Sequence, residues 1–185
     1  MSERRFKMML AGALTATMLL TTPSSATEAG AGECNTLSAN FVICPESSPW
    51  AEARWLQFGD GAALKLGAYW LEFSEDWLQR SPEEGLDEAL DAVLSEVQEA
   101  DREEGFDPPE QLIRDHLETE ELRVVRALHR VDAGDGDMML IATMIASSTD
   151  ARILLMLGND NDVTPDEMDS TIRDLISLIR PGQEG

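Results

Sequence analysis

The clearest pattern in this 185-residue chain is a pair of amphipathic stretches that each follow a helix-starting sequence. Residues 81–84 (Ser-Pro-Glu-Glu) and 164–167 (Thr-Pro-Asp-Glu) both offer an N-cap, a proline at the first helical position and a glutamate that completes a capping box. Apolar residues then recur at helical spacing, which predicts helices from residue 82 to about 103 and from 165 to 180. A shorter helix is predicted from the Asp-Pro-Pro-Glu sequence at 107–110 through Leu117.

The other apolar runs are short or alternate with polar residues, which is typical of strands. The run at 138–147 is almost continuously apolar and predicts a strand buried on both faces. A helix is an alternative at 64–73 and at 122–131, and residues 135–137 and 148–150 have the composition of hairpin turns. The complete set of predicted strands is 41–44, 55–58, 64–73, 122–131, 138–147 and 151–157.

These elements together predict the fold class. A strand buried on both faces needs a layer on each side, and the two long helices can supply both layers. We therefore predict an α+β fold in which an antiparallel β-sheet is flanked by helices on both faces, an α/β/α sandwich, formed by a single domain at 39–181. Residues 27–38 are small and polar and are predicted to be a flexible leader that is pinned from Cys34 onward.

The first 26 residues have the composition of a secretory signal peptide. Basic residues at 4–7 precede a mostly apolar run from Met8 to Leu20, which is too short to span a bilayer comfortably. Ser24 and Ala26 then provide the small residues of a cleavage site. The sequence thus predicts a periplasmic or secreted protein with no integral membrane segment after signal cleavage.

The chain is strongly acidic, with 14 basic and 36 acidic residues and a net charge of −22. Cleavage after Ala26 would remove three basic residues and one acidic residue, leaving 11 against 35 and a net charge of −24. Such a surface disfavours nucleic acid, whose binding depends on lysine and arginine neutralising phosphates. It also repels anionic membranes. The charge fits either a general bias toward solubility or attraction of a basic partner.

Cys34 and Cys44 are the two cysteines of the chain. In an oxidising compartment a close, even-numbered pair predicts one disulfide bond. A reactive or metal-binding pair is the alternative, although the spacing is not that of a Cys-x-x-Cys motif and no histidine lies nearby in the sequence.

Two segments are similar to the PsbP-like superfamily of α/β/α sandwich domains. Residues 69–77 (Tyr-Trp-Leu-Glu-Phe-Ser-Glu-Asp-Trp) resemble the strand that enters a Pro-x-x-Trp turn before the long helix of that superfamily, with Ser74 at the usual place of proline. Residues 153–180 resemble its C-terminal strand and helix, and the likeness covers about 62–181. The resemblance implies the sandwich fold and a binding or accessory protein without catalytic residues.

No catalytic residue or cofactor is predicted. The two histidines are His116, which falls on the apolar side of the predicted short helix, and His129. The sequence has no Gly-x-Ser-x-Gly motif, which would carry the serine nucleophile of a hydrolase. The oxygen-rich loop Asn159-Asp160-Asn161-Asp162 suggests a calcium-stabilised accessory protein, but its spacing is not that of an EF-hand, and a helix-capping loop explains the same residues. A hydrolase that uses a pair of carboxylates is a further alternative.

Four tryptophans lie within 28 residues: Trp50, Trp55, Trp70 and Trp77. Exposed aromatic residues are enriched at binding surfaces, whereas buried ones would simply build the core. We therefore expect an exported, non-enzymatic binding or accessory domain that engages a protein partner or a small ligand through this tryptophan-rich region.

Overall fold

The computed structural model describes residues 34–46, 48–58, 61–75, 85–103, 105–134, 137–160 and 163–182. The predicted signal peptide, most of the predicted leader, Trp77 and the first capping sequence lie outside these ranges. Within them, none of the helices has the length and apolar content required to cross a membrane.

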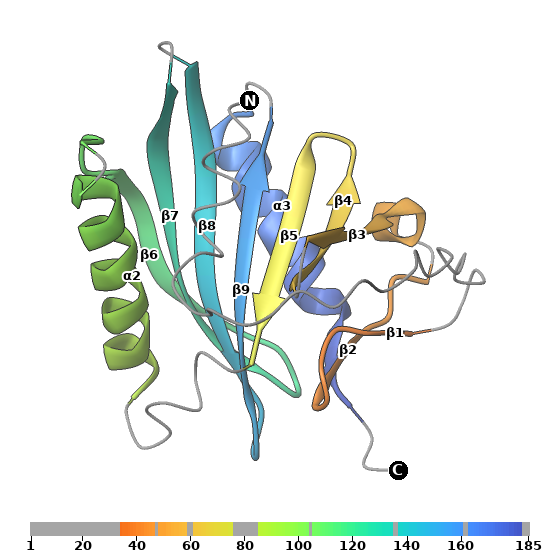
Figure 1. The fold of residues 1–185 in the computed structure, drawn as a ribbon. Coiled ribbons are helices and arrows are strands. Elements are labelled where there is room, and N and C mark those ends of the chain that lie inside the picture. Colours follow the sequence, from red (N-terminus) through yellow and green to blue (C-terminus); the bar gives the residue numbers. More distant parts are fainter. Residues whose placement is uncertain are drawn as a thin grey trace, which may run out of the picture.

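A seven-stranded antiparallel sheet forms the middle layer (Figure 1), with the strand order β3-β4-β5-β9-β8-β7-β6. The apolar strands β8 and β9 lie at the centre, where both of their faces are buried, as predicted for 138–147. The strands are β3 (Arg54–Phe58), β4 (Gly61–Leu66), β5 (Tyr69–Ser74), β6 (Glu110–Glu118), β7 (Arg123–Gly134), β8 (Asp137–Ser147) and β9 (Arg152–Asn159).

Two helices cover opposite faces of this sheet (Figure 1). The helix α2 (Leu86–Glu103) packs on β7 and β8, and α3 (Pro165–Leu178) crosses the other face. The predicted capping box of α3 is present, because the Thr164 hydroxyl accepts from the Glu167 backbone and the Glu167 carboxylate accepts from the Thr164 backbone. The α/β/α sandwich predicted from the sequence is confirmed.

The two ends of the domain meet in a small sheet of order β1-β2-β10. It consists of β1 (Asn35–Thr36), β2 (Phe41–Ile43) and β10 (Ile179–Pro181), so the end of the predicted leader is part of the folded domain. The predicted disulfide between Cys34 and Cys44 closes the β1–β2 hairpin. This hairpin pairs with the strand that directly follows α3, where Ile43 lies opposite Ile179.

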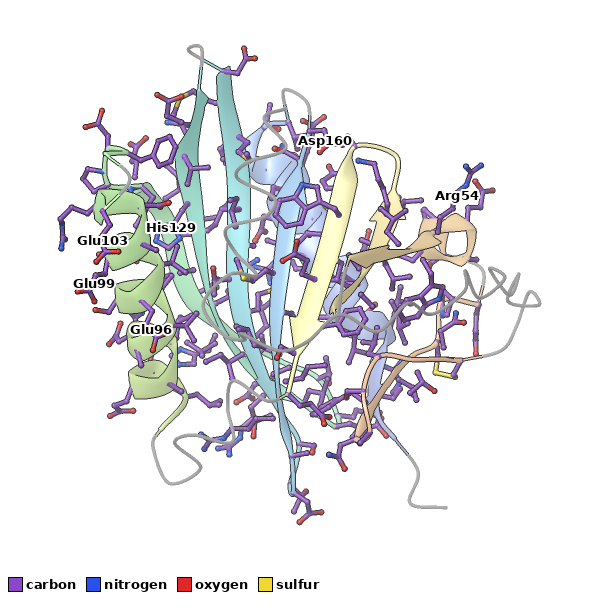
Figure 2. The ribbon with its side chains drawn as sticks, in the orientation of Figure 1. Arg54, Glu96, Glu99, Glu103, His129 and Asp160 are labelled. Atoms are coloured by element: carbon purple, nitrogen blue, oxygen red, sulfur yellow. A yellow bond between two sulfur atoms is a disulfide. The ribbon has the colours of Figure 1, made fainter. Side chains whose placement is uncertain are left out.

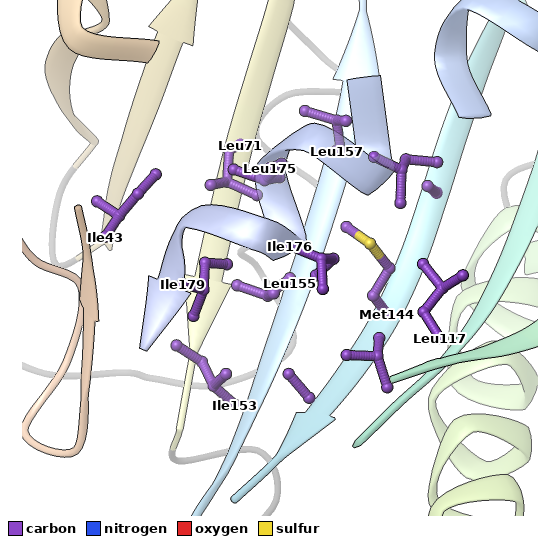
Figure 3. Packing of buried hydrophobic residues seen from close by; sticks show 14 of the residues in the cluster. Ile43, Leu71, Leu117, Met144, Ile153, Leu155, Leu157, Leu175, Ile176 and Ile179 are labelled. Carbon is purple, nitrogen blue, oxygen red and sulfur yellow. The ribbon is translucent and has the colours of Figure 1, made fainter. Parts of the chain in front are cut away.

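Apolar residues form a separate core on each face. The larger core lies between the sheet and α3 (Figure 3) and extends into the small sheet through Phe41 and Ile43. The smaller core lies between α2 and the strands, where Leu90 and Val93 meet Val125 and Ile145. A 3-10 helix, η1 (Pro49–Glu52), contributes Trp50 to the larger core.

Two sequence predictions were wrong in detail. The stretch predicted to be a short helix ending at Leu117 is the edge strand β6, because hydrogen bonding to β7 decided between two conformations that its apolar spacing allowed. The single strand predicted at 64–73 is two strands, β4 and β5, joined by a tight turn. Gly67 at φ +55° supplies the left-handed backbone that this turn requires. The strand predicted at 122–131 is confirmed over its helical alternative.

Candidate binding surfaces of the sheet

The structure divides the predicted tryptophan region between the two faces of the sheet. Trp50 is 4% exposed and belongs to the core under α3. Trp55, on β3, packs against the same core and meets Phe73 edge-on, with ring centroids 5.7 Å apart. Trp70 points to the opposite face, on β5, because its register partners there are Lys65 and Gly158. These three residues therefore do not form one common exposed surface.

The strand β3 forms one edge of the main sheet and pairs only with β4 within the part of the chain that the structure describes. Its pairing is regular from Arg54 opposite Lys65 to Phe58 opposite Gly61, without a bulge. Trp50 lies in η1, which ends directly before β3, and Arg54 is exposed at the start of the strand. Figure 2 shows Arg54 at this side of the molecule, far from α2.

The opposite edge strand, β6, has the features by which proteins prevent unwanted strand pairing. A register shift lies between Gln111 and Ile113, and charged residues fill much of the strand. Three of its side chains form ion pairs: Glu110 with Arg130, Arg114 with Asp91, and Asp115 with Arg126. The two edges thus differ in their capacity to accept another strand.

On the α2 side of the sheet, Trp70 is held flat by a glycine. A methyl group built at Gly158 would collide with ring atoms Cζ2, Cε2 and Cη2 of Trp70. The indole therefore occupies the space above β9 that any larger residue at 158 would fill. Trp70 is 4% exposed, and Ile141, which pairs with Gly158 from β8, is 6% exposed.

Glu72 lies two residues after Trp70 and points to the same face. Its register partners are Ala63 on β4 and Met156 on β9, which are both buried and apolar. The Oε1 atom is closed to solvent and has no hydrogen-bond partner among the described residues. Burial raises the pKa of Glu72 to about 7. Sequence reasoning missed this residue, although a glutamate in the middle of the apolar sequence Tyr-Trp-Leu-Glu-Phe was a visible signal.

The hydrolase alternative requires a second carboxylate beside the first. The described positions around Glu72 on this face are Trp70, Ser74, Ala63 and Met156, and none of them is acidic. Glu72 is therefore a single carboxylate in an apolar setting rather than half of a glycosidase pair.

The two histidines lie at the contact between α2 and the sheet. His116 is on β6 rather than on a helix, and its Nε2 lies 3.0 Å from Asp87 of α2. The hydrogen bond with His116 lowers the pKa of Asp87, and Arg114 lowers it further by a smaller amount. His129 is buried, and burial, followed by the charge of Arg114, lowers its pKa. Of the two, His116 has a contact that helps to hold α2 on the sheet.

A second polar group that the sequence did not reveal is Arg126, which is fully buried on the α3 side of β7. Its Nε donates to Asp115 over 2.5 Å, and its Nη2 contacts Asp169 of α3. The hydrogen bond from Arg126 lowers the pKa of Asp115. At Asp169 burial opposes ionisation, but hydrogen bonds from Arg173 and Arg126 outweigh it and lower the pKa. The group fixes α3 against the sheet.

The two described residues of the predicted calcium loop, Asn159 and Asp160, form hydrogen bonds and an ion pair with other residues of the domain. The side-chain oxygen of Asn159 accepts from the Leu140 backbone over 3.1 Å. Asp160 pairs with Lys65, and its backbone donates to Ala68 (Figure 2). Asn161 and Asp162 lie outside the described residues.

No protein-family model and no curated protein sequence matches this chain, whereas solved structures do. The solution structure of cyanobacterial PsbP (CyanoP) from Synechocystis sp. PCC 6803 has a TM-score of 0.53 at 10% identity, covering 86% of this chain and 98% of that chain. The chain has a PsbP-like fold. This confirms, at the level of the fold, the resemblance predicted from residues 69–77 and 153–180.

The Ran-binding protein Mog1p of Saccharomyces cerevisiae matches with a TM-score of 0.36 at 11% identity, over 76% of this chain and 78% of that chain. At 10% identity, the likeness to CyanoP describes architecture and not activity.

Proposed function

We propose that this protein is an exported, non-enzymatic binding domain that engages a protein partner by pairing a strand of that partner with β3. The observation that carries the proposal is the difference between the two edges. The strand β3 is regular and its outer edge has no strand partner among the described residues, whereas β6 is bulged and charged. Strand addition obtains affinity from main-chain hydrogen bonds and specificity from alternate side chains. The proposed contact with the partner thus lies at the β3 end of the predicted tryptophan region.

The charge of the chain narrows the class of partner. The excess of acidic residues repels a second copy of the same chain and favours an extended segment that carries lysine or arginine. Trp50 and Trp55 support the edge from the core side, so we assign them the role of holding β3 in place rather than of contacting the partner.

The proposal of export is supported by the signal peptide predicted at 1–26 and by the Cys34–Cys44 disulfide, because disulfides persist in the oxidising compartments that exported proteins reach. N-terminal sequencing of the exported protein should begin at Thr27. A protein retained in the cytoplasm with residue 1 or 2 at its N-terminus would contradict export without affecting the binding proposal.

A photo-crosslinking amino acid placed at Arg54, in cells that produce the protein, tests the binding proposal. The matched control is the same amino acid at Glu118, which is exposed on the opposite edge. We expect one partner to be joined from position 54 alone, through an extended basic segment. A synthetic peptide of that segment should then slow hydrogen exchange of β3 amides. Equal crosslinking from position 118, or a peptide that protects no β3 amide, would overturn the proposal.

A further inference from the structure

The methionines of the domain differ widely in their exposure to solvent. Four of the nine methionines of the chain lie in the predicted signal peptide, and the other five lie in the part of the chain that the structure describes. Met144 and Met168 are 0% exposed, Met156 is 9% exposed, and Met139 is partly buried. Met138 is 46% exposed, and it is the one large apolar side chain that is exposed among the described residues. Met138 thus differs from the other four in its access to molecules in solution.

Met138 is exposed because it lies where β7 and β8 extend together beyond the neighbouring strands (Figure 1). It pairs with Asp132 of β7, whereas the pairing of β8 with β9 begins at Ile141. Leu140, two residues further along the same face of β8, is 4% exposed and belongs to the larger core. The edge of this core therefore lies between positions 138 and 140, and the Met138 side chain lies outside it.

We propose that Met138 is an oxidation site of the folded protein, at which hydrogen peroxide converts the thioether to a sulfoxide before the buried methionines react. Methionine is oxidised to its sulfoxide where an oxidant can reach the sulfur atom. Hydrogen peroxide is uncharged, so the net charge of −22 does not repel it as it would repel an anionic oxidant. The site is separated from the β3 edge by β4, β5 and β9, and it does not depend on the proposed protein partner.

The reaction transfers one oxygen atom to the sulfur of Met138. The sulfur donates an electron pair to one peroxide oxygen, so the S–O bond forms as the O–O bond breaks. The proton of the transferred hydroxyl group joins the departing hydroxide to give water, which leaves the sulfur oxidised and the peroxide reduced. Water can hydrate the new oxygen at Met138, whereas at Met144 or Met168 it would be buried in the apolar core. The protein should therefore stay folded after oxidation at position 138.

The experiment is treatment of the purified, folded protein with hydrogen peroxide, followed by mass spectrometry of its peptides at successive times. We expect the Met138 sulfoxide to form about tenfold faster, or more, than the sulfoxides of Met144, Met156 and Met168. The control is the same protein in concentrated urea, where unfolding exposes every sulfur and should make the rates nearly equal. Met138→Leu should remove the fast reaction, whereas the matched variant Met139→Leu should retain it.

A second measurement tests whether the protein tolerates a polar group at this position. The protein oxidised at Met138 alone and the variant Met138→Gln should both unfold at the same urea concentration as the untreated protein. Three results would each overturn the proposal. They are equal rates for Met138 and a buried methionine in the folded protein, a rate at Met138 about tenfold lower than in urea, and a lower urea midpoint after its oxidation.

Discussion

The two faces of the sheet are built from the same strands and are closed in different ways. The face under α3 is sealed by a capped helix, the small sheet and a disulfide, and its buried Arg126 is neutralised by Asp115 and Asp169. The face under α2 is covered by one described helix over β7 and β8, and it leaves Glu72 Oε1 in an apolar setting without a donor among the described residues. The comparison predicts that packing on the α3 face contributes more to stability than packing on the α2 face.

Leu154 and Leu155 test this comparison most strongly, because they are neighbours on β9 that point to opposite faces. Leu155→Ala should destabilise the protein by about 3–5 kcal/mol, since it opens a cavity in the larger core. Leu154→Ala should cost about 2–3 kcal/mol, since the smaller core can relax around it. Urea unfolding measures both. Equal losses, or a larger loss for Leu154→Ala, would show that the two faces contribute alike.

Glu72→Gln should stabilise the protein at alkaline pH. The rise of the Glu72 pKa from 4.5 to about 7 corresponds to roughly 3 kcal/mol. Because the folded state holds this proton more tightly, the wild type loses stability as pH rises from about 4.5 to 7. The variant should therefore be more stable than wild type by up to roughly 3 kcal/mol at pH 8 and nearly equal to it at pH 4. Thermal unfolding across this range gives the difference, and a gap independent of pH would contradict it.

Gly158→Ala should destabilise the protein by about 1–3 kcal/mol, because the added methyl group collides with Trp70. Trp70→Leu in the same chain should remove most of this cost, giving a coupling energy that a double-mutant cycle measures. Gly182→Ala, whose methyl group would approach Asn40 at 3.2 Å on the opposite side of the molecule, should not couple to Trp70. Independent effects of Gly158→Ala and Trp70→Leu would show that the indole is not held by the glycine.

The smallest expected effects on the free energy of unfolding come from the ion pairs of Asp115, on the α3 face, and of Asp87, on the α2 face. Asp115→Asn weakens the partner of a fully buried arginine and should cost about 1–2 kcal/mol near neutral pH. Asp87→Asn, in the exposed group that joins α2 to β6, should cost less than about 1 kcal/mol. Because the folded-state pKa of Asp115 is lowered, its contribution exists above its unfolded pKa and disappears as pH falls through the folded value. The Asp115→Asn deficit, followed by urea unfolding, should close as pH falls through the lowered folded-state pKa of Asp115. A deficit that persists there would have another cause.

Local sequence determined the elements that carry their own start and stop signals. The helix α3 begins at the capping box predicted at Thr164, and the run at 138–147 forms a strand buried on both faces, because its composition suits no exposed position. Close spacing in an expected oxidising compartment predicted the Cys34–Cys44 disulfide. These signals act within a few residues, so they could be identified without knowledge of the fold.

Strand pairing decided the rest. The sequence at 110–118 becomes a strand because β7 offers hydrogen bonds along its whole length, and 64–73 divides at Gly67 because β5 must return beside β4. Register also set the chemistry: it directed Trp55 to the core under α3, turned Trp70 to the other face and placed Glu72 between Ala63 and Met156. A one-residue change in pairing exchanges the two faces of a strand. The amino-acid sequence therefore determined the elements and the sandwich, whereas only the tertiary structure decided which side chains share a surface.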